Sequence, residues 1–191
     1  ESPVWISKET FRDYVQCDFG DDFNLLSVYF NVKDDNHPPL HFMLLHMMTS
    51  IFKGEISVWH GCVINLIAMA ATLWLLGLIG DIIFKNKKNS VGLMVLYGVS
   101  MGIVATTLWI RMYALLTLWT VWGLYLHLRK YARVEQDSFL RVNSKNGKAR
   151  WIGSVGLLVV TVLSFWTQYF GLFFILPLAL VTVVLLAKEK R

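Results

Sequence analysis

Three long stretches with almost no charge constrain this chain more than any other feature. Residues 56–80 and 151–187 contain no Asp, Glu, Lys or Arg, and residues 89–128 contain only Arg111. A bilayer core takes about 20 apolar residues per helix, and backbone within lipid must satisfy its own hydrogen bonds, which favours helices. A soluble helical protein would be expected to carry polar faces that these stretches lack. The sequence therefore predicts an all-α integral membrane protein.

The apolar stretches divide into about five transmembrane helices, three within 56–128 and two within 151–191. We expect the spans at roughly these positions: 56–84, 90–110, 112–128, 151–167 and 170–187. Residues 1–55 would then form part of an outer loop. Within that loop, residues 40–52 ("LHFMLLHMMTSIF") are too few to cross a bilayer, and they predict a short interfacial helix.

The basic residues set the orientation of the predicted spans. Short cytoplasmic loops collect Lys and Arg, and most of the 18 basic residues fall in the short loop at 85–88, in a loop over 129–150 and in the tail. With the predicted spans, these three places lie on one side of the membrane, which predicts a cytoplasmic loop and a basic tail. The net charge of +5 needs no nucleic-acid partner, because these loops would lie against anionic membrane lipids.

The densest polar cluster of the outer side lies in "KDDNHPPLHFMLLHMM", residues 33–48. The residue before a proline avoids the helical region, so the segment before Pro38 is predicted to be extended and stiff. Asp34 and Asp35 would then be held near a helix N-terminus at the membrane surface, where a carboxylate can accept a proton from a hydroxyl group. The alternative is that Asp35 only caps the helix and Asp34 is solvated.

Two further outer turns contain polar groups. Arg111, in "LWIRMYALLTLW", can bind phosphate or carboxylate through two parallel hydrogen bonds, although a snorkelling arginine is the alternative. Gln168 and Tyr169 lie in "SFWTQYFGLFF", where an aromatic belt explains the rings but does not explain the amide.

Metal and redox chemistry receive weaker support from the sequence. The side chains of Asp34, Asp35, His37 and His41 offer oxygen and nitrogen ligands, so no cofactor is certain and a divalent metal stays an open alternative. Cys17 and Cys62 are predicted to be free thiols, because their spacing suggests no disulfide framework. The glycine-rich patterns that bind nucleotides are absent from the sequence.

Together, three segments resemble the GT-C membrane glycosyltransferases. The segments are "DNHPPLHFMLLHMMTSIF", "RMYALLTLW" and "WTQYFGLFF". The most similar branch comprises bacterial relatives of the protein O-mannosyltransferases (glycosyltransferase family 39) and of the lipid A aminoarabinose transferase. Their first outer loop carries an Asp-x-His-Pro-Pro-Leu segment, an Arg-Met-Tyr segment opens a later span, and a later outer turn holds a Thr-His-Tyr-Tyr segment.

The resemblance implies an enzyme that transfers a sugar from a polyprenyl or dolichyl phosphate to an acceptor on the outer face, with inversion. It implies catalytic roles for Asp35 and Asp34, and a donor-binding role for Arg111. The residues His37, Tyr113, Gln168 and Tyr169 complete the implied donor site. It also implies a bacterial plasma membrane and a function in the cell envelope, while the sugar and the acceptor stay unknown.

The sequence departs from the family pattern in ways that leave alternatives open. Ile110 replaces an alanine before the arginine, and Gln168 replaces a histidine. The principal catalytic aspartate of the family is expected upstream of residue 1, so we expect this chain to be a fragment. One alternative is a non-catalytic subunit or truncated member that binds lipid phosphate. A transporter is the last alternative, because no acidic residue lies in the middle of a predicted span.

Overall fold

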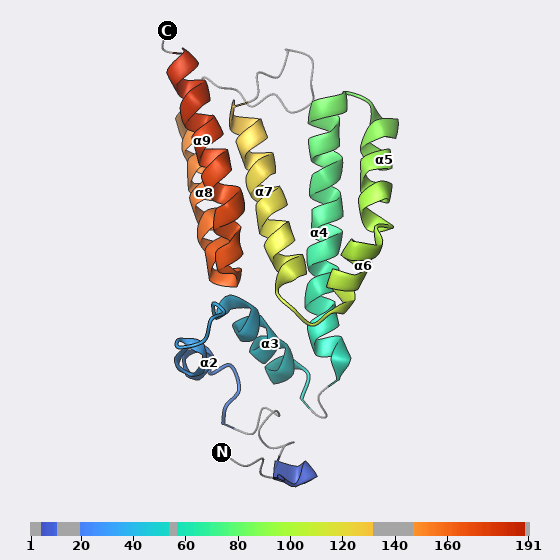
Figure 1. The fold of residues 1–191 in the computed structure, drawn as a ribbon, viewed down its shortest axis with the longest axis vertical. Helices are drawn as coiled ribbons and strands as arrows, with labels where there is room; N and C mark the ends of the chain where they lie inside the picture. Colours follow the sequence, from blue (N-terminus) through green and yellow to red (C-terminus); the bar gives the residue numbers. More distant parts are fainter. Residues whose placement is uncertain (1–4, 11–19, 54–56, 132–146, 190–191) are drawn as a thin grey trace.

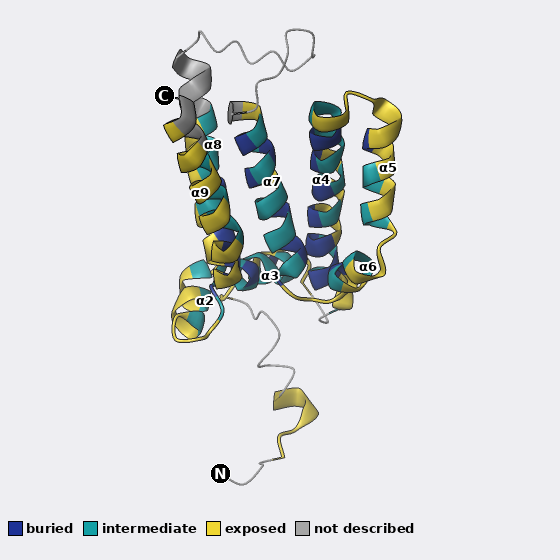
Figure 2. Ribbon diagram, turned by 45° about the horizontal axis from the view of Figure 1, so that its top comes forward, coloured by how far each residue is buried: buried dark blue, intermediate teal, exposed yellow. Residues whose placement is uncertain are grey.

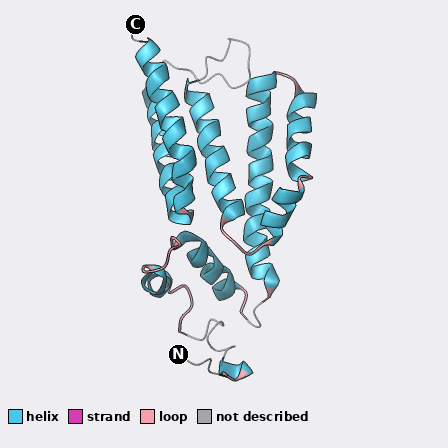
Figure 3. Cartoon of the chain, viewed as in Figure 1, coloured by secondary structure: helices cyan, strands magenta, loops and turns pink. Residues whose placement is uncertain are grey.

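The computed structural model describes residues 5–10, 20–53, 57–131 and 147–189, and within these ranges the chain forms helices and no strand (Figure 3). The all-α prediction is therefore confirmed for the described part of the chain. The helices follow in the order α2 (Leu25–Val32), α3 (Leu40–Ile51), α4 (Val58–Phe84), α5 (Lys87–Gly98), α6 (Met101–Leu108), α7 (Tyr113–Tyr131), α8 (Gly147–Thr167), the 3₁₀ helix η1 (Tyr169–Gly171) and α9 (Leu172–Glu189).

The long helices α4, α7, α8 and α9 run side by side, and the shorter α2 and α3 lie across one end of the bundle, called here the α3 end (Figure 1). Helix α4 contacts α5 and α7, and α7 contacts α8. The buried apolar core joins α4 to α7 through the side chains of Ala68, Leu75, Ile79, Ala114, Leu115, Leu118 and Tyr125. Figure 2 shows that α5 and α9, at the two edges, are much more exposed than α4 and α7.

Helix α4 has defined signals at both ends. The hydroxyl of Ser57 accepts a hydrogen bond from the backbone N–H of Trp59, and the ring of His60 accepts one from the N–H of Ser57 at 3.0 Å. These bonds satisfy donors that the first turn of a helix leaves free. At the other end, Lys85 adopts a left-handed conformation with φ of 50°, which terminates the helix. The helix matches the predicted 56–84 span closely.

A tight contact joins α4 to α5. Gly80 lies so close to Ser90 that a Cβ atom on the glycine would be 2.8 Å from the serine Cα. The hydroxyl of Ser90 donates to the carboxylate of Asp81 at 2.7 Å, and Lys87 forms an ion pair with the same carboxylate. A small residue on each helix thus allows the two backbones to approach.

The predicted 90–110 span is broken in the structure. Helices α5 and α6 are bent by 57° relative to each other. Between them Ser100 is extended, and its carbonyl accepts from the N–H of Val104, which starts a new helix. The sequence carries Gly98, Ser100 and Gly102 at this place, a break signal that sequence reasoning missed because the run contains no charge or proline.

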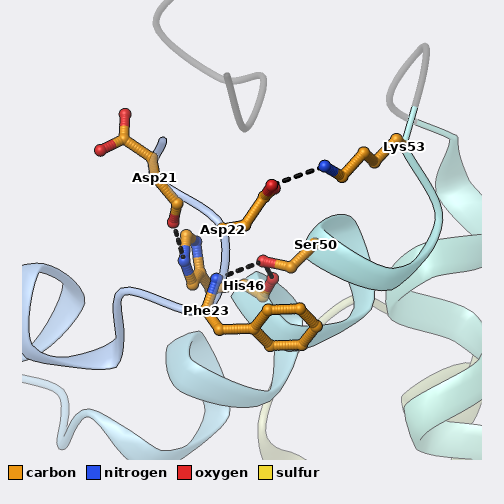
Figure 4. Close-up of polar contacts among 6 residues, drawn as sticks. All are labelled: Asp21, Asp22, Phe23, His46, Ser50 and Lys53. Atoms are coloured by element: carbon orange, nitrogen blue, oxygen red, sulfur yellow. Dashed lines mark hydrogen bonds and ion pairs between the residues drawn. The ribbon is translucent and has the colours of Figure 1, made fainter. Parts of the chain in front are cut away.

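Residues 21–23 are tied to α3 and to Lys53 by long-range polar contacts (Figure 4). The carboxylate of Asp22 pairs with Lys53 at 2.5 Å, and the ring of His46 donates to the carbonyl of Asp21 at 3.0 Å. The hydroxyl of Ser50 accepts from the N–H of Phe23, whose φ of 57° places it in the left-handed region. Helix α3 matches the predicted interfacial helix at 40–52 to within one residue.

Length and composition identify one helix in the described part of the chain, α4, as able to cross a membrane. The bent pair of α5 and α6 would be a second if it forms one span. Helix α3, residues 153–167 of α8 and residues 169–184 of η1 and α9 are shorter apolar helices. The helices thus occur where the five spans were predicted, but this criterion does not support five spans.

Parts of the predicted domain organisation lie outside the described residues. Residues 132–146 of the predicted cytoplasmic loop lie outside the described ranges, and so do Cys17 and the end of the tail. In the described portion, α7 continues to Tyr131 and α8 already begins at Gly147, so both helices extend into the 129–150 range.

Candidate functional site

The segment before α3 holds an acidic side chain next to a histidine. After α2 the chain turns, and the N–H of Asp35 donates to the carbonyl of Val32 at 2.9 Å. One carboxylate oxygen of Asp35 lies 3.3 Å from Nδ1 of His37, with both side chains partly exposed. The contact orients a carboxylate that solvent or a ligand can reach.

Asp35 does not cap α3. The N-cap of this helix is Pro39, which provides no side-chain hydrogen bond, and its carbonyl accepts from the N–H of Met43. The capping alternative for Asp35 is therefore wrong. Asp34 is exposed and, among the described residues, has no hydrogen bond or ion pair, which agrees with a solvated side chain.

His41 lies in the first turn of α3 and is almost fully buried, with 2% of its surface exposed. Neither ring nitrogen has a hydrogen-bond partner within the described ranges. Burial, and to a smaller extent the positive charge of Arg111, lower the pKa of His41 to about 4, so the ring is neutral at pH 7. An unsatisfied buried polar group costs about 1–3 kcal/mol, which requires a functional or structural explanation.

Arg111 is exposed in the short connection between α6 and α7. Its backbone N–H donates to the carbonyl of Trp109 at 2.7 Å, which makes a tight turn. The next residue, Met112, is 2% exposed and anchors the start of α7, where Tyr113 is half-buried. The guanidinium group is thus accessible while the backbone on both sides is fixed.

The turn between α8 and α9 gives Gln168 a local role. Gln168 is extended and only 5% exposed, and its side-chain oxygen accepts from the N–H of Tyr169 at 3.2 Å. The amide therefore caps η1. This cap explains why a glutamine stands among the aromatic residues, and the sequence did not reveal it. Tyr169 is exposed, and its ring lies 5.0 Å from that of Phe165.

The structure brings some of the predicted residues together but not all of them. The charge of Arg111 acts on His41, so these two residues lie within electrostatic range of each other, and the α6–α7 connection lies at the same end of the bundle as α3 (Figure 1). Helix α3 also contacts α8, which ends next to Gln168. Among the described residues, no hydrogen bond or ion pair joins Asp35 to Arg111 or to Tyr113. In the same ranges, no three His, Cys, Asp or Glu side chains lie close enough to hold a metal ion.

Sequence reasoning missed a set of residues on α4 that hold the α6–α7 connection. The thiol of Cys62 donates to the carbonyl of Leu108 at 3.7 Å, so Cys62 is free, as predicted. The side-chain amide of Asn65 donates to the carbonyl of Trp109 at 2.5 Å. An asparagine within a predicted span was the available signal, because polar groups in lipid are costly without a partner.

Comparison with known proteins adds no further identification. No known protein family, curated protein or solved structure matches this chain.

Proposed function

We propose that this chain belongs to a membrane glycosyltransferase that uses a sugar linked to a polyprenyl or dolichyl phosphate. The observation that carries the proposal is that His41, in the "HPPLH" segment, lies within electrostatic range of Arg111, although the two motifs of the resemblance are far apart in the sequence. An exposed arginine within electrostatic range of a buried, neutral imidazole, at one end of an apolar bundle, suits a phosphate that arrives from lipid.

The proposal treats the protein as integral to a bacterial plasma membrane, with the α3 end outside. In this arrangement α4, the α5–α6 pair, α7, α8 and α9 are the five spans. Helices α2 and α3 lie at the outer interface, and the connections at 85–86 and 132–146 face the cytoplasm. The exposed apolar side chains of α9, such as Phe173, Leu176 and Leu180, then contact lipid or another part of the protein.

The chemistry assigned to the site is an inverting transfer. The acceptor hydroxyl attacks the anomeric carbon, a new C–O bond forms there, and the bond to the phosphate oxygen breaks. Arg111 stabilises the charge that develops on the leaving phosphate. The carboxylate of Asp35, oriented by His37, takes the proton of the acceptor hydroxyl. His37, Tyr113, Gln168 and Tyr169 are proposed to line the donor site, and Asp34 to assist Asp35.

The alternative function is a non-catalytic subunit that binds lipid phosphate. It shares the Arg111 site and lacks the transfer step. Binding and transfer must therefore be measured separately.

Native mass spectrometry of the purified protein tests the donor site. Arg111→Ala is compared with wild type and with Arg129→Ala, which removes an exposed arginine from the opposite end of the bundle. We expect a co-purifying prenyl-phosphate lipid in wild type and in Arg129→Ala, with loss of the lipid in Arg111→Ala. Absence of such a lipid from all three proteins, even after prenyl phosphate is added, would overturn the proposal.

A further inference from the structure

Asn65 and Arg111 are linked through one backbone carbonyl. The oxygen of Trp109 accepts from the side-chain amide of Asn65 at 2.5 Å and from the N–H of Arg111 at 2.7 Å. Because a carbonyl oxygen only accepts, the nitrogen of the Asn65 amide must face it, which fixes the orientation of the amide. Both available positions on this oxygen are therefore occupied.

The Asn65 side of the link is shielded from water, whereas Trp109 is exposed. Asn65 has no exposed surface, and its own oxygen has no partner among the described residues. Partial burial makes this hydrogen bond electrostatically stronger than one fully exposed to water. The donor side of the amide is thus used to hold the α6–α7 connection, while the acceptor side makes no stabilising hydrogen bond.

A second contact from the same helix supports the first. Cys62 lies about one helical turn before Asn65, and its thiol donates to the carbonyl of Leu108. The last carbonyls of α6 would otherwise lack partners, as at any helix end. Helix α4 therefore holds two consecutive carbonyls, directly before the exposed guanidinium of Arg111.

We propose that Asn65 is a positioning residue that fixes the backbone of Arg111, and thereby the donor phosphate site. This inference rests on the proposed function for its ligand, a prenyl monophosphate. Its structural part, the restraint of the turn at 109–111, stands independently of any ligand. Asn65 itself is fully buried and does not touch the ligand.

The test compares Asn65→Ala with Thr72→Ala in the purified protein. Thr72 is an equally buried polar residue of α4, but its hydroxyl donates within its own helix, to the carbonyl of Ala68 at 2.7 Å. Both variants thus remove a buried polar group from α4, and only Asn65→Ala releases the turn. Cys62→Ser is a second control, because its hydroxyl can still donate to the carbonyl of Leu108 and the neighbouring contact is kept.

The first measurement is hydrogen–deuterium exchange of the backbone amides over residues 108–113. We expect faster exchange at Arg111 in Asn65→Ala, and wild-type exchange in Thr72→Ala and Cys62→Ser. Equal exchange in Asn65→Ala and Thr72→Ala would overturn the restraint. This result does not depend on the proposed function.

The second measurement is the affinity for farnesyl phosphate. Loss of one charge-positioning hydrogen bond predicts about tenfold weaker binding in Asn65→Ala. In an Arg111→Ala background, Asn65→Ala should add no further loss, because its effect acts through the guanidinium. An additive loss, or an equal loss in Thr72→Ala, would overturn the positioning role. If wild type does not bind farnesyl phosphate, that result counts against the donor site alone. The hydrogen–deuterium exchange measurement would then decide whether Asn65 restrains the turn.

Discussion

Ile110 fills the space that Gly61 leaves on the surface of α4. A Cβ atom built on Gly61 would overlap the branched side chain of Ile110. In the family that the chain resembles, an alanine precedes the arginine, so the larger residue here is matched by the smallest residue on the facing helix. The pair fixes the turn before Arg111 by shape, in addition to the hydrogen bonds from Cys62 and Asn65.

Gly61→Ala should destabilise the protein, because the rigid turn of α4 and the branched side chain cannot both keep their places. Overpacking of this kind costs about 1–3 kcal/mol. Gly61→Ala with Ile110→Ala should recover most of that loss. Thermal unfolding of both variants, of Ile110→Ala and of wild type provides the check. Additive effects of the two substitutions would show that the residues are independent.

His41 should make stability depend on pH. Its folded pKa of about 4 lies below the ordinary histidine value of 6.5, so the unfolded chain binds a proton first as the pH falls. The contribution of His41 to the free energy of unfolding is therefore fully present above pH 6.5. As the pH falls from 6.5 to 4, the free energy of unfolding decreases progressively, by about 3 kcal/mol.

Denaturant unfolding of wild type and His41→Phe at several pH values in this interval tests this expectation. The free-energy difference between the two proteins should shift in favour of His41→Phe as the pH falls. In an Arg111→Ala background the shift should shrink, because one of the two causes that lower the pKa is removed. A difference that stays constant with pH would contradict the neutral, buried imidazole.

Asp35→Asn should reduce transfer far more than Asp34→Asn. The Asp35 carboxylate is held by His37, and an amide of the same shape cannot accept the acceptor proton. A general base contributes about 10²- to 10⁴-fold, so a fall in kcat of that order is expected for Asp35→Asn. Transfer from a prenyl-phosphate sugar by the reconstituted protein is the readout. Similar rates in both variants would remove Asp35 from the catalytic role.

Single cysteines introduced at exposed positions can test the five proposed spans. With Cys17 replaced by serine, Asn36→Cys, Asn89→Cys and Phe170→Cys are treated with a membrane-impermeant maleimide on intact cells. We expect labelling at residues 36 and 170, and labelling at 89 only after permeabilisation. If residue 170 instead behaves like residue 89, the α5–α6 pair, α7 and α8 do not make the three crossings proposed.

Local sequence determined the helices. The uncharged runs placed α4 and α3 almost to the residue, because the burial of apolar side chains and the demand for internal hydrogen bonds act along a continuous segment. The charges of Asp35 and Arg111 were identified in the same way, as isolated polar groups beside apolar helices. The break at Ser100 was missed although Gly98 and Gly102 flank it, because no charge or proline interrupts the hydropathy there.

Only the tertiary structure decided which side chains meet. That His41 is buried within reach of the charge of Arg111, that Asn65 binds the carbonyl of Trp109 and that Gln168 is used as a cap follow from how helices distant in sequence cross. Hydropathy along the chain specifies that a helix forms and which parts avoid water. It does not specify the rotation and contact of one helix against another, and those set the electrostatic surroundings and hydrogen-bond partners of each polar group.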